Sequence, residues 1–211
     1  MTLTIAVANL KGGTAKSTSA AYLAHAFAGL GRSVIVVDAD PQQSITEWAE
    51  LAHWTIPTIG LAEKTLHRRL PGIVGRKYDV VIIDTPGVSP QNKAEAERAP
   101  VGIVHSAMRA ADLVVIPIGP TTMEARRIAR TLLAVQDAGK DPRDVWFLLN
   151  RAVANAGSTE ATRDLLTARG SHVFQVAIPR REPLAQAMGS PITGPLFGHQ
   201  SAAMQLLEET P

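Results

Sequence analysis

The amino-acid sequence predicts an α/β fold, a doubly wound and mostly parallel sheet with helices on both faces. Short runs of aliphatic and β-branched residues alternate along the chain with stretches of helical periodicity. This alternation is typical of βα units. The runs are apolar throughout instead of alternating with polar residues, as expected for strands that are buried on both faces.

Six of these runs are expected to form strands, at Leu3–Ala8, Ser33–Asp38, Asp79–Asp84, Asp112–Pro117, Val145–Asn150 and His172–Ile178. Helices are expected near residues 16–30, 43–52, 61–70, 93–111, 122–138, 157–169 and 200–209. Glycine follows three of these helices, where the chain must leave the helical conformation; the three are Gly31, Gly139 and Gly170.

Composition sets the class of protein. The chain has 211 residues, of which 45% are hydrophobic and 19% charged, so we expect one globular domain over residues 1–211. It has no cysteine, which excludes disulfides, cysteine nucleophiles, thiolate zinc sites and cysteine-ligated iron–sulfur clusters. No run approaches the roughly 18 apolar residues that span a bilayer. The apolar start lacks the basic residues of a signal peptide, so a cytoplasmic protein is expected.

The segment after the first expected strand has the composition of a phosphate-binding loop. It reads K-G-G-T-A-K-S-T from Lys11 to Thr18 and continues into a helix. Backbone N–H groups of a glycine-rich loop at a helix N-terminus bind phosphate oxygens. In such a loop Lys16 contacts the β- and γ-phosphates, the Ser17 hydroxyl ligates Mg²⁺, and Thr18 donates to the α-phosphate.

This loop departs from the strict pattern G-x-x-x-x-G-K-[ST], because Leu10 and Ala15 occupy its two glycine positions. Taken alone, the segment is also compatible with a Gly-Gly turn that happens to be flanked by lysines. The strand–turn–helix context decides between the two interpretations.

Carboxylates stand at the ends of the next two central strands. V-V-D-A-D-P-Q provides Asp38 and Asp40, and I-I-D-T-P-G provides Asp84. Acidic residues beside a nucleotide hold Mg²⁺ or its waters, or orient the attacking water. A single aspartate at a strand end usually caps the loop that follows, and Asp38 and Asp84 are each compatible with that role. Three neighbouring strand ends with matched chemistry favour a nucleotide site.

Together the three motifs resemble those of the ParA/MinD family, P-loop ATPases of the SIMIBI type that carry a deviant Walker A loop. The resemblance covers essentially the whole chain, with later matches in D-L-V-V-I-P-I-G-P, L-L-N-R and I-P-R-R-E-P-L-A-Q-A-M-G-S-P-I. The short length, and S-I-T-E-W after the second motif, look most like the small plasmid-partition ParA proteins.

The resemblance implies a role for each matching residue. Lys11 corresponds to the signature lysine, which reaches across a dimer to the partner's nucleotide in the manner of an arginine finger. Asp40 corresponds to the residue that positions the hydrolytic water. Asn150 corresponds to the asparagine that contacts adenine, and Pro179 opens the segment that flanks the base. The resemblance implies ATP and Mg²⁺ as cofactors. ATP is favoured over GTP, since no guanine-binding N-K-x-D motif is present.

The candidate site residues therefore fall into three groups. The catalytic group is Lys11, Lys16 and Asp40, and the metal-binding group is Ser17, Asp38 and Asp84. The nucleotide-binding group is Gly12, Gly13, Thr14, Ala15, Lys16, Ser17, Thr18, Asn150 and Pro179.

Two features depart from the family pattern. Ala15 replaces the usual glycine before the second lysine, and a modest cost is expected because alanine allows α-region dihedrals. The segment between Asp84 and Asp112 is longer than in short relatives by roughly ten residues, the size of a small functional loop. It is equally compatible with a partner-binding loop and with a longer surface loop.

The function implied is a switch. ATP favours the homodimer, since Lys11 meets phosphate only there, and ADP releases it. The family's track is nonspecific DNA, and its cargo is a plasmid, a chromosome region or a protein assembly. A ParB-like or other adaptor protein stimulates slow hydrolysis. Plasmid segregation and a cytoplasmic, nucleoid-associated location follow from that resemblance.

Clustered arginines are the candidates for DNA contact. They are Arg126, Arg127 and Arg130 in one expected helix, and the pair Arg180 and Arg181 further on. Each cluster is also compatible with an ordinary solvated surface.

Two alternatives remain open at this point. A MinD-like regulator of the division site needs a basic amphipathic helix for membrane attachment, and the segment 199–211 is acidic. A metabolic P-loop enzyme that transfers phosphate to a small molecule needs further polar residues beyond the nucleotide set, and none is evident in the sequence.

Overall fold

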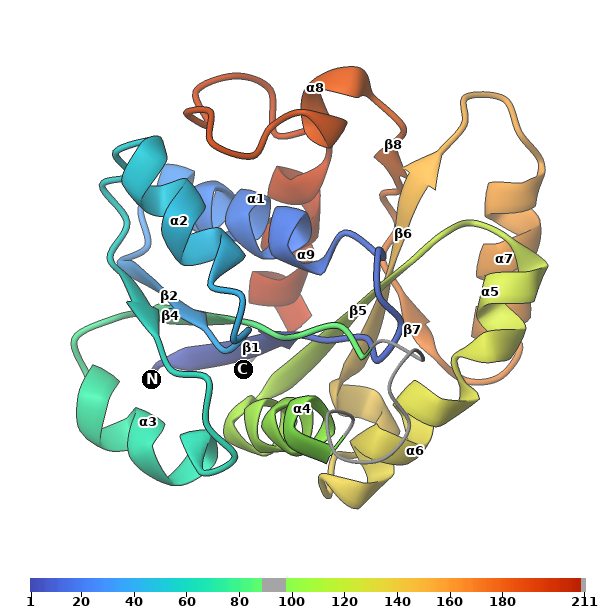
Figure 1. The fold of residues 1–211 in the computed structure, drawn as a ribbon. Helices are drawn as coiled ribbons and strands as arrows, with labels where there is room; N and C mark the ends of the chain where they lie inside the picture. The colour runs from blue at the N-terminus through green and yellow to red at the C-terminus, as the bar shows by residue number, and fades with distance from the viewer. Residues whose placement is uncertain (89–97, 210–211) are drawn as a thin grey trace.

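The central feature of the structure is one parallel β-sheet (Figure 1). In this computed structural model, residues 1–88 and 98–209 are described. The strand order is β3-β2-β4-β1-β5-β6-β7, and β8 pairs with β6 off this path. The strands are β1 Leu3–Val7, β2 Val34–Asp38, β3 Thr58–Gly60, β4 Val80–Asp84, β5 Leu113–Ile118, β6 Val145–Ala152, β7 His172–Val173 and β8 Ile178–Pro179. The predicted parallel, doubly wound sheet is confirmed.

Helices cover both faces of this sheet. Figure 1 shows α1, α2 and α9 on one face and α3, α4 and α6 on the other, with α5 beside α7 at one side. The helices are α1 Lys16–Gly29, α2 Ser44–Leu51, α3 Leu66–Val74, α4 Arg98–Ala110, α5 Thr122–Arg127, α6 Ala129–Asp137, the 3₁₀ turn η1 Pro142–Asp144, α7 Ser158–Thr167, α8 Glu182–Ala185 and α9 His199–Glu209. Within the part of the chain that the structure describes, no helix combines the length and apolarity needed to cross a bilayer.

The core lies in two layers because successive strand residues point to opposite faces. Ile5 and Val36 belong to the layer beneath α1 and α9. Their neighbours Ala6 and Val37 belong to the layer beneath α3 and α4. All of β2 and β4 is buried, which explains why these strands read as unbroken apolar runs.

The pairing brings the functional strand ends together. β1 lies between β4 and β5, and β4 lies between β1 and β2. Val7 is in register with Asp84, and Asp84 is in register with Asp38. The loops that follow β1, β2 and β4 therefore leave the same edge of the sheet.

Several predicted elements need correction. The run 172–178 is not one strand: β7 pairs with Trp146 and Phe147, whereas β8 pairs with Asn150 and Ala152 further along β6. The helix expected at 122–138 is divided at Ile128 into α5 and α6. The helix expected at 61–70 lies instead at Leu66–Val74 and includes Pro71.

Three short elements were not expected at all, β3, η1 and α8. The first part of the helix expected at 93–111 falls outside the described residues, as does most of the segment expected to be longer than in relatives. Its described part, α4, confirms the helix from Arg98 onward.

Candidate nucleotide-binding site

The loop between β1 and α1 has the backbone of an anion site. Gly13 has φ 70° and Ala15 has φ 65° with ψ 36°, so both lie in the left-handed region. No side chain caps the start of α1, which leaves its first backbone N–H groups available to a phosphate. Alanine was expected at position 15 at a modest cost because it allows α-region dihedrals, and the α region that it occupies is the left-handed one, directly before helix α1 begins.

Lys16 is the buried cation of this loop. Its side chain is 7% exposed, and its Nζ donates to the Lys11 carbonyl oxygen at 3.2 Å. Burial lowers the pKa of Lys16, and the nearby carboxylates of Asp84 and Asp40 partly oppose that shift. A phosphate would stabilise the charged form, since the hydrogen bond of this ammonium within the described residues goes to a neutral carbonyl oxygen.

The loop after β4 packs directly against this phosphate loop. A Cβ at Gly87 would lie 3.1 Å from the Cα of Gly12 and 3.4 Å from the Lys16 Nζ. Lys11 and Val88 form a parallel β-bridge, and the Val88 N–H donates to the Leu10 carbonyl at 3.0 Å. A glycine at position 87 is what permits this approach.

Asp84 is the unpartnered acid of the site. It is fully buried, and neither carboxylate oxygen has a hydrogen-bond partner among the described residues. Burial raises the pKa of Asp84 to about 7, although the neighbouring Ser17 hydroxyl and the Lys16 ammonium act in the opposite direction. A buried carboxylate without a partner is costly, and a cation held together with Ser17 would satisfy it.

Asp38 differs because the protein already satisfies it. Its Oδ1 accepts from the Asp40 N–H at 3.0 Å, and its Oδ2 accepts from the Thr46 N–H at 3.0 Å and the Thr46 hydroxyl at 2.9 Å. Burial raises the pKa of Asp38, and these bonds oppose the rise. The capping interpretation of Asp38 is thus realised, and Asp84 has the freer oxygens for a metal. Asp40 is half-buried and accepts from the Gln42 N–H at 2.9 Å.

These residues fit a magnesium ion that a nucleotide brings with it. Within the described ranges no group of three or more histidine, cysteine or acidic side chains forms a metal cage. Mg²⁺ bound with nucleotides needs no such cage, because phosphates and waters supply most of its ligands. Ser17 and Asp84 would hold the ion, and the ion would neutralise charge that develops on the phosphates.

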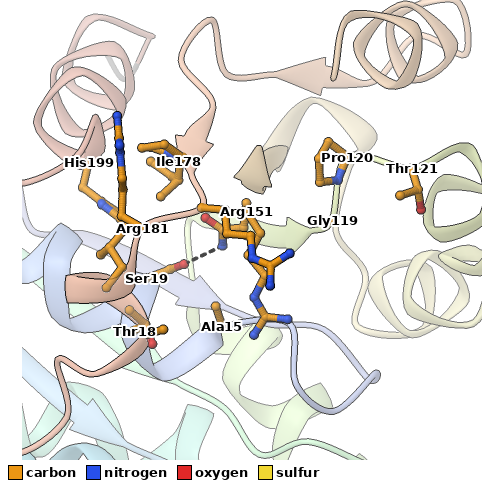
Figure 2. A pocket seen from close by; sticks show the side chains of 15 residues that line it. Ala15, Thr18, Ser19, Gly119, Pro120, Thr121, Arg151, Ile178, Arg181 and His199 are labelled. Atoms are coloured by element: carbon orange, nitrogen blue, oxygen red, sulfur yellow. Dashed lines mark hydrogen bonds between the residues drawn. The ribbon is translucent and has the colours of Figure 1, made fainter. Parts of the chain in front are cut away.

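A cavity of about 620 Å³ continues from the start of α1. Figure 2 shows Ala15, Thr18 and Ser19 on one wall, Gly119, Pro120 and Thr121 on a second, and Ile178, Arg181 and His199 on a third. The expected residues Asn150 and Pro179 also line it. The buried Asn150 Nδ2 donates to the Ser19 hydroxyl at 2.9 Å, which fixes the amide at the wall of a space of suitable size for a nucleoside.

Sequence reasoning missed several residues of this cavity. Arg151 follows Asn150 with φ 61° and lines the same space. The Nδ1 of His199 forms a hydrogen bond with the Leu196 carbonyl oxygen, and its buried Nε2 has no hydrogen-bond partner among the residues that the structure describes. Burial lowers the pKa of His199 to about 4. Only the packing of α9 against α1 places His199 here, and no local motif indicates it.

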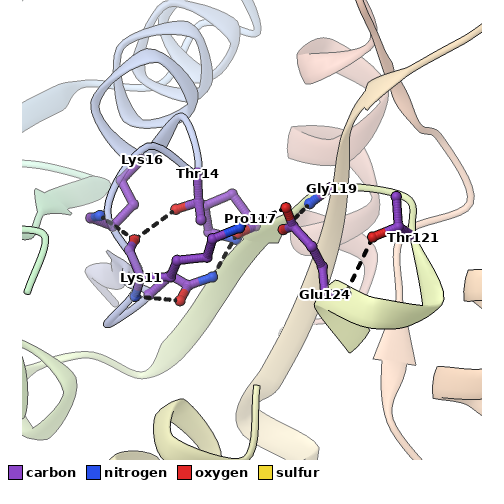
Figure 3. A network of polar contacts seen from close by, with 8 residues as sticks. Lys11, Thr14, Lys16, Pro117, Gly119, Thr121 and Glu124 are labelled. Carbon is purple, nitrogen blue, oxygen red and sulfur yellow. Dashed lines mark hydrogen bonds and ion pairs between the residues drawn. The ribbon is translucent and has the colours of Figure 1, made fainter. Parts of the chain in front are cut away.

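Lys11 lies on the other side of the phosphate loop. Its Nζ forms an ion pair with Glu124 Oε1 at 2.7 Å (Figure 3). With Glu124 and Arg127 it lines a second cavity, of about 480 Å³, which does not share residues with the cavity of Asn150. The side chain of Lys11 therefore points away from the nucleotide space of its own chain.

The five candidate DNA arginines separate into two groups. Arg126, Arg127 and Arg130 are exposed on α5 and α6, and the last two also line the second cavity. Arg180 and Arg181 are exposed as well, but they line the cavity of Asn150. Arg127 and Arg130 thus lie at a different cavity from Arg180 and Arg181.

Comparison with known proteins agrees with this site. The profile of the family described as "CobQ/CobB/MinD/ParA nucleotide binding domain" matches residues 5–192. "Maintenance of carboxysome distribution protein A" of Gloeobacter kilaueensis is 34% identical over 178 residues, which are 82% of this chain and 75% of that protein. "Chromosome-partitioning ATPase Soj" of Thermus thermophilus is 29% identical over 220 residues, covering 87% and 83% of the two chains.

The fold is also that of solved structures. An ATP complex of McdA from Cyanothece superposes with a TM-score of 0.75 at 18% identity, covering 100% of this chain and 98% of that one. At such identity the likeness concerns the fold. The family profile and the relatives carry the assignment: the chain belongs to the CobQ/CobB/MinD/ParA family of nucleotide-binding domains and is a P-loop ATPase of the ParA/MinD type, a class that uses ATP with Mg²⁺.

Proposed function

We propose that this ATPase is a dimerising switch that positions or partitions a cargo, with nonspecific DNA as its track. The names of two relatives support this proposal, since one is a protein for the maintenance of carboxysome distribution and the other is a chromosome-partitioning ATPase. The cargo would be a plasmid, a chromosome region or a protein assembly. The protein would then associate with the nucleoid in the cytoplasm.

The observation that carries the proposal is the placement of the two lysines of the phosphate loop. Lys16 is buried beside Asp84 and Asp40, where it would bind the phosphates of its own chain. The Lys11 side chain is 49% exposed and lines a separate cavity. A lysine that faces outward from a phosphate loop is suited to a nucleotide held by a second copy of the chain.

The remaining roles follow from the geometry of the site. Backbone N–H groups from Gly12 to Thr18 would bind the phosphates. Ser17 and Asp84 would hold Mg²⁺, with Asp38 supporting its waters. Asp40 would orient the attacking water, since its half-buried carboxylate lies close enough to raise the pKa of Asp84. Asn150 and Pro179 would bind the adenine.

The exposed arginines Arg126, Arg127 and Arg130 supply the proposed DNA contact. They lie on consecutive helices at one side of the molecule, and phosphate neutralisation by such residues needs no base contact. Arg180 and Arg181 border the nucleotide cavity, so their contact with DNA would depend on the bound nucleotide. A ParB-like or other adaptor would accelerate hydrolysis.

The structure gives less support to a membrane-bound regulator. Helix α9 buries Ala202, Ala203 and Leu206 against the core. Its apolar face is therefore already occupied, and its exposed residues include Glu208 and Glu209. A bilayer-binding helix requires a free apolar face and a basic polar face.

A titration with a random-sequence DNA duplex tests the proposal. It is carried out with Mg·ATP and with Mg·ADP, each at two salt concentrations. We expect the protein to bind DNA with ATP only. The association constant should fall steeply as the salt concentration rises, because phosphate contacts release counterions. Equal binding with both nucleotides, or none with either, would reject the DNA-tracking switch while leaving the ATPase assignment in place.

A further inference from the structure

Glu124 is the ion-pair partner of the outward-facing lysine. Its Oε1 lies 2.7 Å from the Lys11 Nζ, with the two side chains 27% and 49% exposed (Figure 3). The two residues are far apart in sequence. Lys11 belongs to the loop after β1, whereas Glu124 lies in the first turn of α5.

The carboxylate of Glu124 is held in place by its surroundings. The Oε2 atom accepts a hydrogen bond from the Gly119 N–H at 2.9 Å, and the backbone N–H of Glu124 donates to the Thr121 hydroxyl at 3.2 Å. A Cβ at Gly119 would lie 3.1–3.2 Å from the carboxyl group of Glu124. Glycine at position 119 therefore leaves the space in which this carboxylate sits.

The charge of this carboxylate is stabilised by the same contacts. Burial by itself would raise the pKa of Glu124, but the hydrogen bonds from Lys11 and the Gly119 amide outweigh it and hold the pKa below its ordinary value. Glu124 is therefore ionised at neutral pH and attracts the ammonium of Lys11 at the wall of the second cavity.

We propose that Glu124 is a positioning residue for Lys11, which keeps the lysine on its own chain until a nucleotide in a second copy competes for it. This proposal rests on the proposed function, in which Lys11 contacts the partner's phosphate. Lys11 then exchanges one anionic partner for another when the dimer forms. The exchange reduces the net gain from the phosphate contact, so Glu124 opposes dimerisation.

The surroundings of Glu124 also connect this exchange to the nucleotide cavity. Gly119 and Thr121, which hold Glu124, line the cavity of Asn150, whereas Glu124 itself lines the cavity of Lys11. Glu124 thus stands between the two spaces. A change in its ion pair acts on residues that face the nucleoside.

The test is the dissociation constant of the dimer with a slowly hydrolysed ATP analogue and Mg²⁺, measured by sedimentation. Glu124→Gln keeps an oxygen for the Gly119 N–H but presents an uncharged amide to Lys11. We expect the dimer Kd to fall about two- to fivefold, the range expected when a partly exposed ion pair no longer competes. In the Lys11→Ala background the same substitution is expected to have no effect.

Glu63→Gln is the matched control, because Glu63 forms an ion pair with Arg69 beside α3, away from the phosphate loop. It should leave the dimer Kd unchanged. A second readout uses the nucleotide-free monomer: NMR titration of the Glu124 carboxyl should show a higher pKa in Lys11→Ala than in the wild-type protein.

The outcomes separate this proposal from the proposed function. If the wild-type protein dimerises with ATP but Glu124→Gln dimerises equally or more weakly, the positioning role is refuted and the switch stands. An unchanged carboxyl titration in Lys11→Ala would refute the ion pair itself. If the wild-type protein forms no ATP-dependent dimer, both proposals fail.

Discussion

Asp38 and Asp84 are register partners at the ends of two neighbouring parallel strands, yet the protein satisfies only one of them. Asp38 accepts three hydrogen bonds from Asp40 and Thr46, whereas neither oxygen of Asp84 has a partner in the described chain. The first carboxylate shapes the loop after β2. The second is left for a ligand, and its charge is costly until that ligand arrives.

The raised pKa of Asp84, about 7, predicts a pH-dependent stability of the nucleotide-free protein. Between the ordinary pKa near 4 and about 7, the folded protein retains a proton that the unfolded chain has lost. The free energy of unfolding therefore falls as pH rises through this window. Asp84→Asn removes this dependence. Urea unfolding should therefore show that the free energy of unfolding of the variant, relative to that of the wild-type protein, is about 1–3 kcal/mol higher at pH 8 than at pH 5. Parallel pH profiles would contradict the assignment.

Ala15 supplies a second prediction, because its left-handed backbone is unfavourable for any residue with a Cβ. Ala15→Gly should raise the free energy of unfolding by about 0.5–1 kcal/mol, the conformational cost less the extra entropy of glycine in the unfolded chain. Ala161→Gly, at an exposed position inside α7, should lower it by a similar amount. Thermal unfolding of both variants measures the contrast, and destabilisation by both would show that position 15 is not strained.

Asn150 is expected to bind the base and not the phosphates. Asn150→Ala removes the buried partner of the Ser19 hydroxyl and should weaken ATP binding about tenfold, as expected for loss of one or two buried hydrogen bonds. Binding of inorganic triphosphate should remain unchanged, because the phosphate loop is intact. Calorimetric titration with both ligands checks this, and equal losses for the two would point to a general loss of structure.

Asp40 is expected to act on the water and not on the nucleotide. Asp40→Ala should bind ATP, form the dimer and hydrolyse the nucleotide at least about a hundredfold more slowly, the usual scale for losing a positioned general base. A phosphate-release assay together with sedimentation separates these steps. Hydrolysis at the wild-type rate would show that another group orients the water.

The arginines of α5 and α6 predict a change in salt dependence. If Arg126 and Arg130 each contact a DNA phosphate, their double alanine variant should reduce the slope of log K against log salt by about two. Its nucleotide binding should be unaffected. Arg32 and Arg76 are exposed near the opposite edge of the sheet, just before β2 and β4, and their double variant should leave the slope unchanged. An unaltered slope in the first variant would remove these arginines from the interface.

Much of the fold was predictable because the central strands are buried on both faces. β1, β2, β4, β5 and β6 lie within one or two residues of their predicted ranges. The edge strand β3 was missed because it has only three residues, none of them buried. The single strand predicted over 172–178 was wrong because β7 and β8 pair with two separate parts of β6. The composition of a segment does not show which part of a neighbouring strand it pairs with.

Site residues were predictable only where they belong to short sequence motifs. The motifs at the ends of β1, β2 and β4 indicated the phosphate loop and the three aspartates, and the register of those strands confirms their proximity. The Glu124–Lys11 pair and the place of His199 depend on how α5 and α9 pack. The left-handed backbone of Ala15 has no signal in the sequence, because glycine is the residue that normally marks such a conformation.

The absence of a side chain at Gly87 has a mechanical consequence. The backbone of this residue lies so near Gly12 that even a methyl group would intrude, and Lys11 is bridged to Val88 beside it. The first residues after β4 and the phosphate loop are thus in direct backbone contact. A side chain at position 87 would therefore press on the backbone of the phosphate loop and on the Lys16 ammonium, so that the phosphate loop depends on the shape of a segment more than seventy residues further along the chain.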